Sequence, residues 1–223
     1  RIDMPAIWGG LVLGATGVAF TQALTTTTIA NTMFIMSGIP FVTMAIAFVF
    51  LNERISRFTL IAMAAAASGV ILMVTDAIGA GDLYGNVMAL LTALGFSVFA
   101  VIVRAGHRVD MLPSLIIAGL FVIAASIIPA WGNLGITLPD LLLCLFWGGV
   151  LSGLGHWIYI NAARYLLAAE LTLFLLVEFA LAPIWVWYFA HEVPSTATLY
   201  GGSIVIIAVA IRTLAELRPR PAR

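Results

Sequence analysis

The residues of this sequence best suited to chemistry are two ionisable side chains that lie inside strongly apolar stretches. Glu178 follows the run LTLFLLV, and His156 lies in the apolar stretch from 140 to 163. Burying a carboxyl group in a hydrophobic helix is costly, so such a group usually has a partner or a function. Moving between wet and dry surroundings would also change the affinity of Glu178 for protons, which predicts proton exchange. The structural alternative is a permanently protonated Glu178 that only hydrogen-bonds a neighbouring helix.

Helical spacing gathers further candidates around these two residues. His156 and Tyr159 are three positions apart and would share one helix face, and we expect both to face a central cavity with Glu178. The other predicted substrate-binding residues are aromatic walls and polar amides: Trp157, Trp185, Asn31 and Gln22. His156, Asn31 and Gln22 have structural alternatives, because a histidine can be a neutral packing residue and amides often bridge helices.

Other kinds of chemistry are poorly supported by the composition. A single cysteine, Cys144, excludes an internal disulfide and a cysteine-based metal cluster, and we predict neither metal nor cofactor. The formal net charge is zero, so the chain lacks the excess positive charge that is typical of nucleic-acid-binding proteins. An enzyme would need clustered nucleophile, base or metal ligands. Ser152 and His156, four residues apart, are a weak exception, so we predict that the protein is not an enzyme.

The composition places these residues in a membrane. Hydrophobic residues make up 63% of the chain and charged residues only 9%, whereas a soluble domain has about a quarter charged residues. Crossing a hydrocarbon layer takes about 20 apolar helical residues. The alternating pattern of a membrane β-barrel is absent. The sequence predicts an all-α polytopic membrane protein with eight spans: roughly 8–24, 28–51, 58–75, 85–104, 113–130, 140–163, 169–190 and 197–214.

The arginines predict how these spans are oriented. The chain has ten arginines and no lysine, and alternating the eight spans puts all ten on one side. The opposite loops carry Asp76, Asp82, Asp140 and Glu192. The positive-inside rule makes the arginine side cytoplasmic, with both ends of the chain inside, and a bacterial inner membrane is the expected location.

A repeated motif predicts an internal duplication. Residues 8–14 read WGGLVLG and residues 147–153 read WGGVLSG, and the same offset of 139 residues pairs Glu53 with Glu192. Two spans precede the second motif, whereas seven residues precede the first. A complete repeat is therefore five helices, and we expect about 55 residues with two further helices to be missing upstream. Since five is odd, the two copies would cross the membrane in opposite directions.

This duplication divides the chain into unequal parts. Residues 1–76 would hold three helices of the first repeat, 83–215 the complete second repeat, and 216–223 a basic cytoplasmic tail. At the same offset, His156, Tyr159 and Glu178 pair with Gly17, Phe20 and Ile39, so only the second repeat carries the ionisable groups.

Several features are interpreted as structural. The Gly10-x-x-x-Gly14 and Gly149-x-x-x-Gly153 motifs predict close helix packing, as does the small-residue run at 62–69. Ser37-Gly38, with Pro40, should interrupt the span at 28–51. The glutamates at the helix ends, at positions 53 and 192, are expected to be solvated turn residues.

The order of these segments resembles a known family. The runs SGIPFVTMAIAFVFLNERISRFTLIAMAAAASGVILMV and NAARYLLAAELTLFLLVEFALAPIWVWYFAHEVPS are similar to the two repeats of the drug/metabolite transporter superfamily, EamA-type domain. The resemblance covers Trp8 to about Arg212. It departs from the family pattern in lacking two helices and in having Phe179 where the second repeat often has proline.

The resemblance implies a ten-helix fold of two inverted five-helix repeats (5+5), of which eight helices are present here. It also implies export of small metabolites, often amino acids, by alternating access, as a monomer or homodimer in the lipid bilayer. Protons are the expected coupling ion. Efflux of cationic drugs is the alternative function, and a membrane-embedded enzyme is a weaker one.

Overall fold

The structure is a computed structural model that describes residues 3–27, 32, 35–53, 56–74, 83–131, 135–175, 177–178, 181, 188 and 196–217. These residues form helices and contain no strand, so the all-α prediction is confirmed for them. The helices are α1 (Met4–Thr26), α3 (Ile39–Leu51), α4 (Arg57–Val74), α5 (Leu83–Ala105), α6 (Pro113–Ala130), α7 (Leu138–Leu145), the π-helix η1 (Phe146–Ser152), α8 (Gly153–Ala162), α9 (Ala168–Leu173) and α11 (Thr196–Leu217).

Three helices in the described part of the chain are long and apolar enough to cross a membrane. They are Met4–Thr26, Leu83–Ala105 and the continuous run Leu138–Ala162 formed by α7, η1 and α8. Shorter apolar helices cover Ile39–Leu51, Arg57–Gly69, Pro113–Ile127 and Leu199–Ala208. All seven helices coincide with predicted spans, and the three long ones meet the length that a hydrocarbon layer requires.

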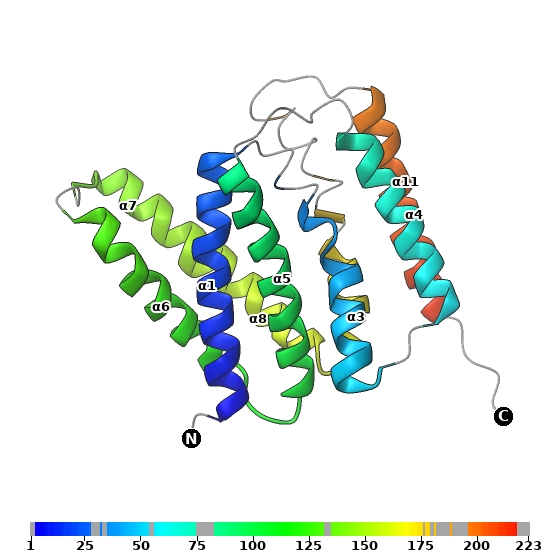
Figure 1. The fold of residues 1–223 in the computed structure, drawn as a ribbon, viewed down its shortest axis with the longest axis horizontal. Coiled ribbons are helices and arrows are strands. Elements are labelled where there is room, and N and C mark those ends of the chain that lie inside the picture. The colour runs from blue at the N-terminus through cyan, green and yellow to red at the C-terminus, as the bar shows by residue number, and fades with distance from the viewer. Residues whose placement is uncertain are drawn as a thin grey trace.

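The helices lie side by side and alternate in direction (Figure 1). α1 begins at the lower end of the molecule in this view, and α11 finishes there. α5 runs downward, and the α7–η1–α8 run also descends from the upper end. The two segments that carry the repeated Trp-Gly-Gly motif, α1 and α7–η1–α8, therefore run in opposite directions along the bundle.

Glycines of the first motif allow α1 to pack closely against α6. A Cβ atom added at Gly10 would lie 2.6 Å from the Ile117 Cβ and 2.7 Å from the Ser114 carbonyl oxygen. One added at Gly14 would lie 2.7 Å from the Phe121 Cβ. Ordinary contacts are 3.4–4 Å, so only glycine fits at this separation. The packing prediction is confirmed for this pair.

The second glycine pair differs. A Cβ at Gly149 would meet no atom within 4 Å, and one at Gly153 would meet only the Gly148 carbonyl oxygen of its own helix, at 3.9 Å. Within the described residues, the prediction of close helix packing at this pair is therefore wrong. The reason is geometrical: α6 covers the first motif, whereas no described helix covers the second, and residues 138–151 of α7 and η1 are all exposed.

The small-residue run at 62–69 packs α4 against α11, as predicted. A Cβ at Gly69 would lie 2.6 Å from the Gly201 carbonyl oxygen, so the two backbones touch. Met63, Ala66 and Val205 are fully buried between the two helices. This contact joins the predicted first repeat to the second.

The predicted interruption of the span at 28–51 is confirmed. Ser37 and Gly38 form a turn, and α3 begins at Ile39 with Pro40 in its first turn, where the missing N–H costs no helical hydrogen bond. At its other end, Asn52 has a φ of 56°, the left-handed conformation that terminates helices and that asparagine tolerates better than most residues.

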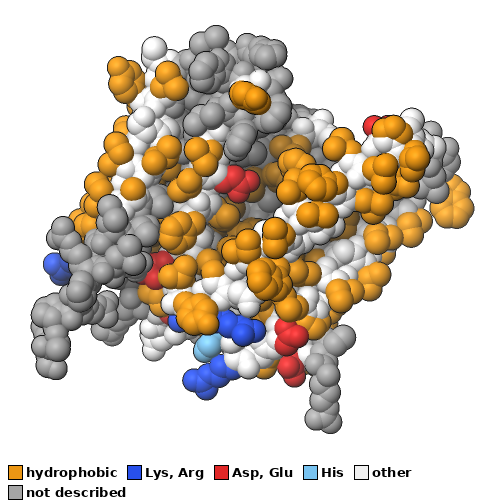
Figure 2. All heavy atoms as spheres, turned by 180° about the vertical axis from the view of Figure 1, so that it is seen from behind, with side chains coloured by type: hydrophobic (Ala, Val, Ile, Leu, Met, Phe, Trp, Pro, Cys, Tyr) orange, Lys and Arg blue, Asp and Glu red, His pale blue; other side chains and the backbone are white. Residues whose placement is uncertain are grey.

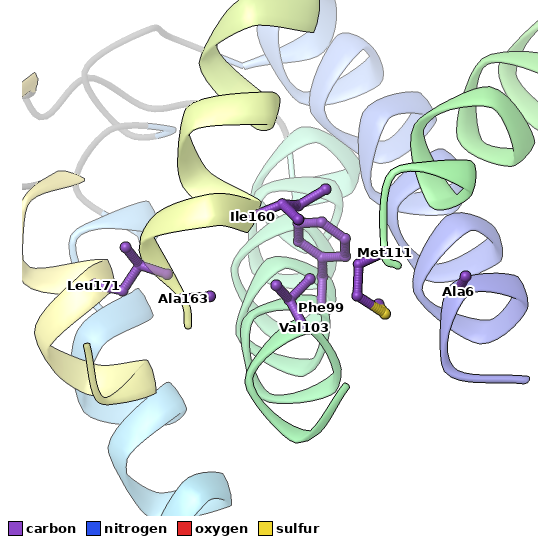
Figure 3. Close-up of a cluster of buried hydrophobic side chains, with 7 residues drawn as sticks. All are labelled: Ala6, Phe99, Val103, Met111, Ile160, Ala163 and Leu171. Carbon is purple, nitrogen blue, oxygen red and sulfur yellow. The ribbon is translucent and has the colours of Figure 1, made fainter. Parts of the chain in front are cut away.

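One buried cluster joins α1, α5, α8 and α9 towards the lower end of the bundle. It contains Ala6 of α1, Phe99 and Val103 of α5, Met111, Ile160 and Ala163 at the end of α8, and Leu171 of α9 (Figure 3). Seen from behind, the surface is hydrophobic over most of its described area, and the Arg side chains lie in its lower half (Figure 2). Basic groups at one end of an apolar bundle are the distribution that the positive-inside rule describes.

Candidate functional site

α8 positions the two polar side chains of the predicted site. It follows the seven-residue π-helix η1, which contains the second Trp-Gly-Gly motif, and π-helical segments occur frequently at functional sites. The His156 Nδ1 atom lies 2.8 Å from the Ser152 carbonyl oxygen, one turn earlier. A carbonyl oxygen can only accept, so Nδ1 must carry the proton. In a neutral ring, Nε2 is then the free acceptor.

His156 and Tyr159 belong to an aromatic cluster with two phenylalanines of α5. The Tyr159 ring stacks on Phe99, with centroids 6.1 Å apart, and meets Phe96 edge-on at 5.5 Å. Phe99 also meets the His156 ring edge-on at 6.4 Å. These distances are those at which aromatic pairs attract beyond their burial. The cluster fixes the orientation of both polar rings.

The hydroxyl group of Tyr159 is buried within this cluster. Its oxygen has no hydrogen-bond partner among the residues that the structure describes. Leaving a buried polar group unsatisfied costs about 1–3 kcal/mol. Buried hydroxyls without a partner are rare in folded proteins, so this one calls for an explanation such as a bound water or ligand.

Glu178 lies beyond the end of α9, on the segment after the turn at Phe174. Its neighbour Val177 packs against the cluster between α4 and α11. The Glu178 side chain itself is exposed and forms no hydrogen bond with other described residues. The described contacts therefore do not join Glu178 to His156 or Tyr159.

Of the remaining predicted site residues, the two that the structure describes do not join the aromatic cluster. Trp157 is 48% exposed, and its carbonyl oxygen accepts from the Asn161 side chain at 2.7 Å. Gln22 is half-buried near the end of α1, and its carbonyl oxygen accepts from Thr26 at 2.6 Å. Asn31 and Trp185 lie outside the described residues.

Two site residues were missed in the sequence. Phe96 and Phe99 lie in the apolar stretch LGFSVFAV, in which no periodic feature distinguishes them from packing residues. Their i, i+3 spacing on α5 is the only signal that they share a face. Their role depends on contact with α8, about 60 residues later, which no local pattern contains.

The prediction that Glu53 is a solvated turn residue is wrong. Its side chain is only 11% exposed, and its Oε1 atom accepts a hydrogen bond from Arg104 Nε at 2.8 Å. The left-handed Asn52 turns the chain at the end of α3, and the Glu53 N–H donates to the Ala47 carbonyl oxygen at 3.4 Å. This turn directs the carboxylate towards α5 instead of into solvent. Position 192, its counterpart in the repeat, lies outside the described residues.

Comparisons with known proteins identify the fold and no activity. No protein-family model matches the chain, and no curated protein does. Among solved structures, 26 chains match. One, described only as "Crystal structure of protein", superposes with a TM-score of 0.77 over 98% of this chain and 79% of its own length, at 16% sequence identity. The arrangement of helices in this chain therefore recurs in a protein of very different sequence.

Proposed function

We propose that this protein is an alternating-access transporter of the drug/metabolite transporter superfamily, EamA type. It exports small metabolites such as amino acids across the bacterial inner membrane, with both chain ends in the cytoplasm. Its complete fold is ten helices in two inverted five-helix repeats. The composition, the three helices long enough to cross a membrane and the opposite directions of the two Trp-Gly-Gly segments support this assignment.

The observation that carries the proposal is the buried Tyr159 hydroxyl, which has no partner among the described residues, in the aromatic cluster that Tyr159 shares with His156. Sites for small molecules are mostly apolar, with few polar groups that fix the ligand's orientation. The hydroxyl can donate to a substrate carboxylate. Nε2 of a neutral His156 can accept from a substrate ammonium group. Phe96 and Phe99 supply the apolar wall.

This donor and acceptor pair favours a zwitterion, the charge pattern of an amino acid. A cationic drug would use only the acceptor and the aromatic faces, because it has no carboxylate for the hydroxyl to bind. Efflux of cationic drugs is therefore the alternative function, which the test below distinguishes. In this proposal, the transport site does not convert its substrate chemically.

Glu178 is the proposed proton carrier. It is a carboxyl group in an apolar stretch, and such groups mark ion and proton pathways in membrane proteins. Its exposed side chain, without a partner among the described residues, leaves it free to exchange a proton as access alternates. Alternating access would move it between wet and dry surroundings, which favour its charged and neutral forms respectively.

Counterflow in proteoliposomes, with a panel of radiolabelled amino acids and cationic dyes, tests the substrate class. We expect exchange of at least one zwitterionic amino acid. Replacing Tyr159 with Phe should weaken it about tenfold or more, because one hydrogen bond to a charged group is lost. Tyr165→Phe is the matched control, since Tyr165 is 86% exposed. Exchange of cations alone would support the alternative, and equal effects of the two variants would contradict the site.

A pH gradient tests the proton carrier. Glu178→Gln should abolish uphill export driven by the gradient while retaining counterflow, since glutamine keeps the shape and cannot release a proton. Asp3→Asn is the control, because Asp3 lies at the start of α1 and its side chain caps nothing. Gradient-driven export that survives in Glu178→Gln would exclude the carboxyl as the coupling group.

A further inference from the structure

The Glu53–Arg104 ion pair holds four chain segments together at one end of the bundle. Glu53 follows α3, Arg104 is in the last turn of α5, and their contacts reach the end of α8 and the start of α9. α3 and α5 both finish at the lower end of the molecule (Figure 1). Glu53 belongs to the predicted first repeat, and the other three segments belong to the second.

Both charges are placed where helix dipoles favour them. The Glu53 Oε2 atom accepts from the Ala168 N–H at 3.2 Å, at the first residue of α9. The Arg104 Nη1 atom donates to the Ala163 carbonyl oxygen at 3.0 Å, at the end of α8, and to that of Arg164 at 3.4 Å. A negative charge at a helix N-terminus and a positive charge at a C-terminus are both stabilising. The pair thus makes three hydrogen bonds to the α8–α9 turn, besides the one between its own side chains.

Small residues fill the space beside the pair. Ala47 of α3, Val101 of α5 and Ala168 of α9 form one buried cluster, with Leu51 packed against it. Ala168 belongs both to this cluster and to the pair's hydrogen bonds. Separating α3 from α9 would expose the cluster and break the pair in the same movement. The packing and the ion pair therefore report one closed arrangement of α3, α5 and α9.

We propose that the Glu53–Arg104 pair is a latch that keeps this end of the transporter closed. This inference rests on the proposed function, in which the arginine-bearing end is cytoplasmic and must open once in each cycle. Packed interfaces have two discrete arrangements, and a charge pair made in only one of them biases the equilibrium towards it. The latch stabilises the state closed to the cytoplasm, and loading from the cytoplasm requires it to break.

The test measures access to the cluster and needs no substrate. In a Cys144→Ser background, Val101→Cys places a thiol of similar size in the buried cluster. A membrane-impermeant maleimide, added to the arginine-bearing side of membrane vesicles, then reports how often this end opens. We expect Glu53→Gln and Arg104→Gln each to raise the labelling rate about tenfold or more, because truncating a partly buried charge pair strongly favours separation of its segments.

Arg108→Gln is the matched control. It removes an arginine four residues later, one that is exposed and makes no ion pair with another described residue. Its labelling rate should equal that of the parent. If Glu53→Gln does not fold, Arg104→Lys keeps the charge but loses the planar fork that binds carboxylate and carbonyls together, and it should also raise the rate. Unchanged labelling in the latch variants, or an equal rise in Arg108→Gln, would overturn the latch.

The two proposals fail separately. Faster labelling without counterflow of any substrate would retain the latch as a conformational lock and reject the transport function. Counterflow with unchanged labelling in the latch variants would retain the transporter and reject the latch.

Discussion

The two Trp-Gly-Gly motifs allow a matched test of helix packing, because the same substitution meets different surroundings. In Gly10→Ala the new Cβ would lie 2.6 Å from the Ile117 Cβ and 2.7 Å from the Ser114 carbonyl oxygen. The shorter distance is about 0.8 Å below the 3.4 Å of an ordinary contact. The Ser114 oxygen is backbone and cannot rotate away, so α1 and α6 must separate. In Gly149→Ala the new atom meets nothing within 4 Å.

The expected free energies follow from two opposing effects. Overpacking at Gly10 costs about 1–3 kcal/mol. Alanine in place of glycine stabilises a helix by about 0.5–1 kcal/mol. Gly10→Ala should therefore lower the free energy of unfolding by about 0.5–2 kcal/mol. Gly149→Ala should leave it unchanged or raise it by up to about 1 kcal/mol.

Equilibrium unfolding of the 223-residue chain, titrated with SDS in mixed detergent micelles and followed by circular dichroism, measures both free energies. Gly10→Ala should unfold at a lower SDS fraction than the parent, and Gly149→Ala should not. If Gly149→Ala were as destabilised as Gly10→Ala, the second motif would also be covered by a helix, and the reasoning from these distances would be refuted.

Two further predictions concern the contact between α4 and α11 and the turn that ends α3. Gly69→Ala would place a Cβ 2.6 Å from the Gly201 carbonyl oxygen and should lower the free energy of unfolding by about 0.5–2 kcal/mol in the same assay. The control Gly119→Ala, whose new Cβ would meet nothing within 4 Å, should not lower it. Equal stability of the two variants would exclude a close α4–α11 contact. Asn52→Gly should be tolerated because φ is 56°, whereas Asn52→Val should lower the free energy of unfolding by about 1–2 kcal/mol. By displacing Glu53, Asn52→Val should also speed the labelling of Val101→Cys. A stable Asn52→Val with slow labelling would contradict the role of this turn.

Some features of the site could be read from the sequence because they depend on local spacing. The i, i+3 relation of His156 and Tyr159 puts both on one face of a helix wherever α8 lies, and the structure places both rings against Phe99. Trp157, one position from His156, points about 100° away on any α-helix, so its absence from the cluster also follows from helical geometry. Its selection as a wall of the site rested on residue type alone.

The sequence alone determined that the described chain is helical and where several helices begin and end. In a membrane the backbone hydrogen bonds are satisfied within helices or closed barrels, and this chain, with 9% charged residues, lacks the alternating pattern of a barrel. Pro40 and Asn52 mark helix boundaries through their own φ preferences. Only the tertiary structure decided which glycines are covered and which charges are paired. Gly10 and Gly149 have nearly the same neighbours in sequence, and Glu53 lies 51 residues from Arg104. Such contacts depend on how whole helices pack, and no local pattern of residue types contains that information.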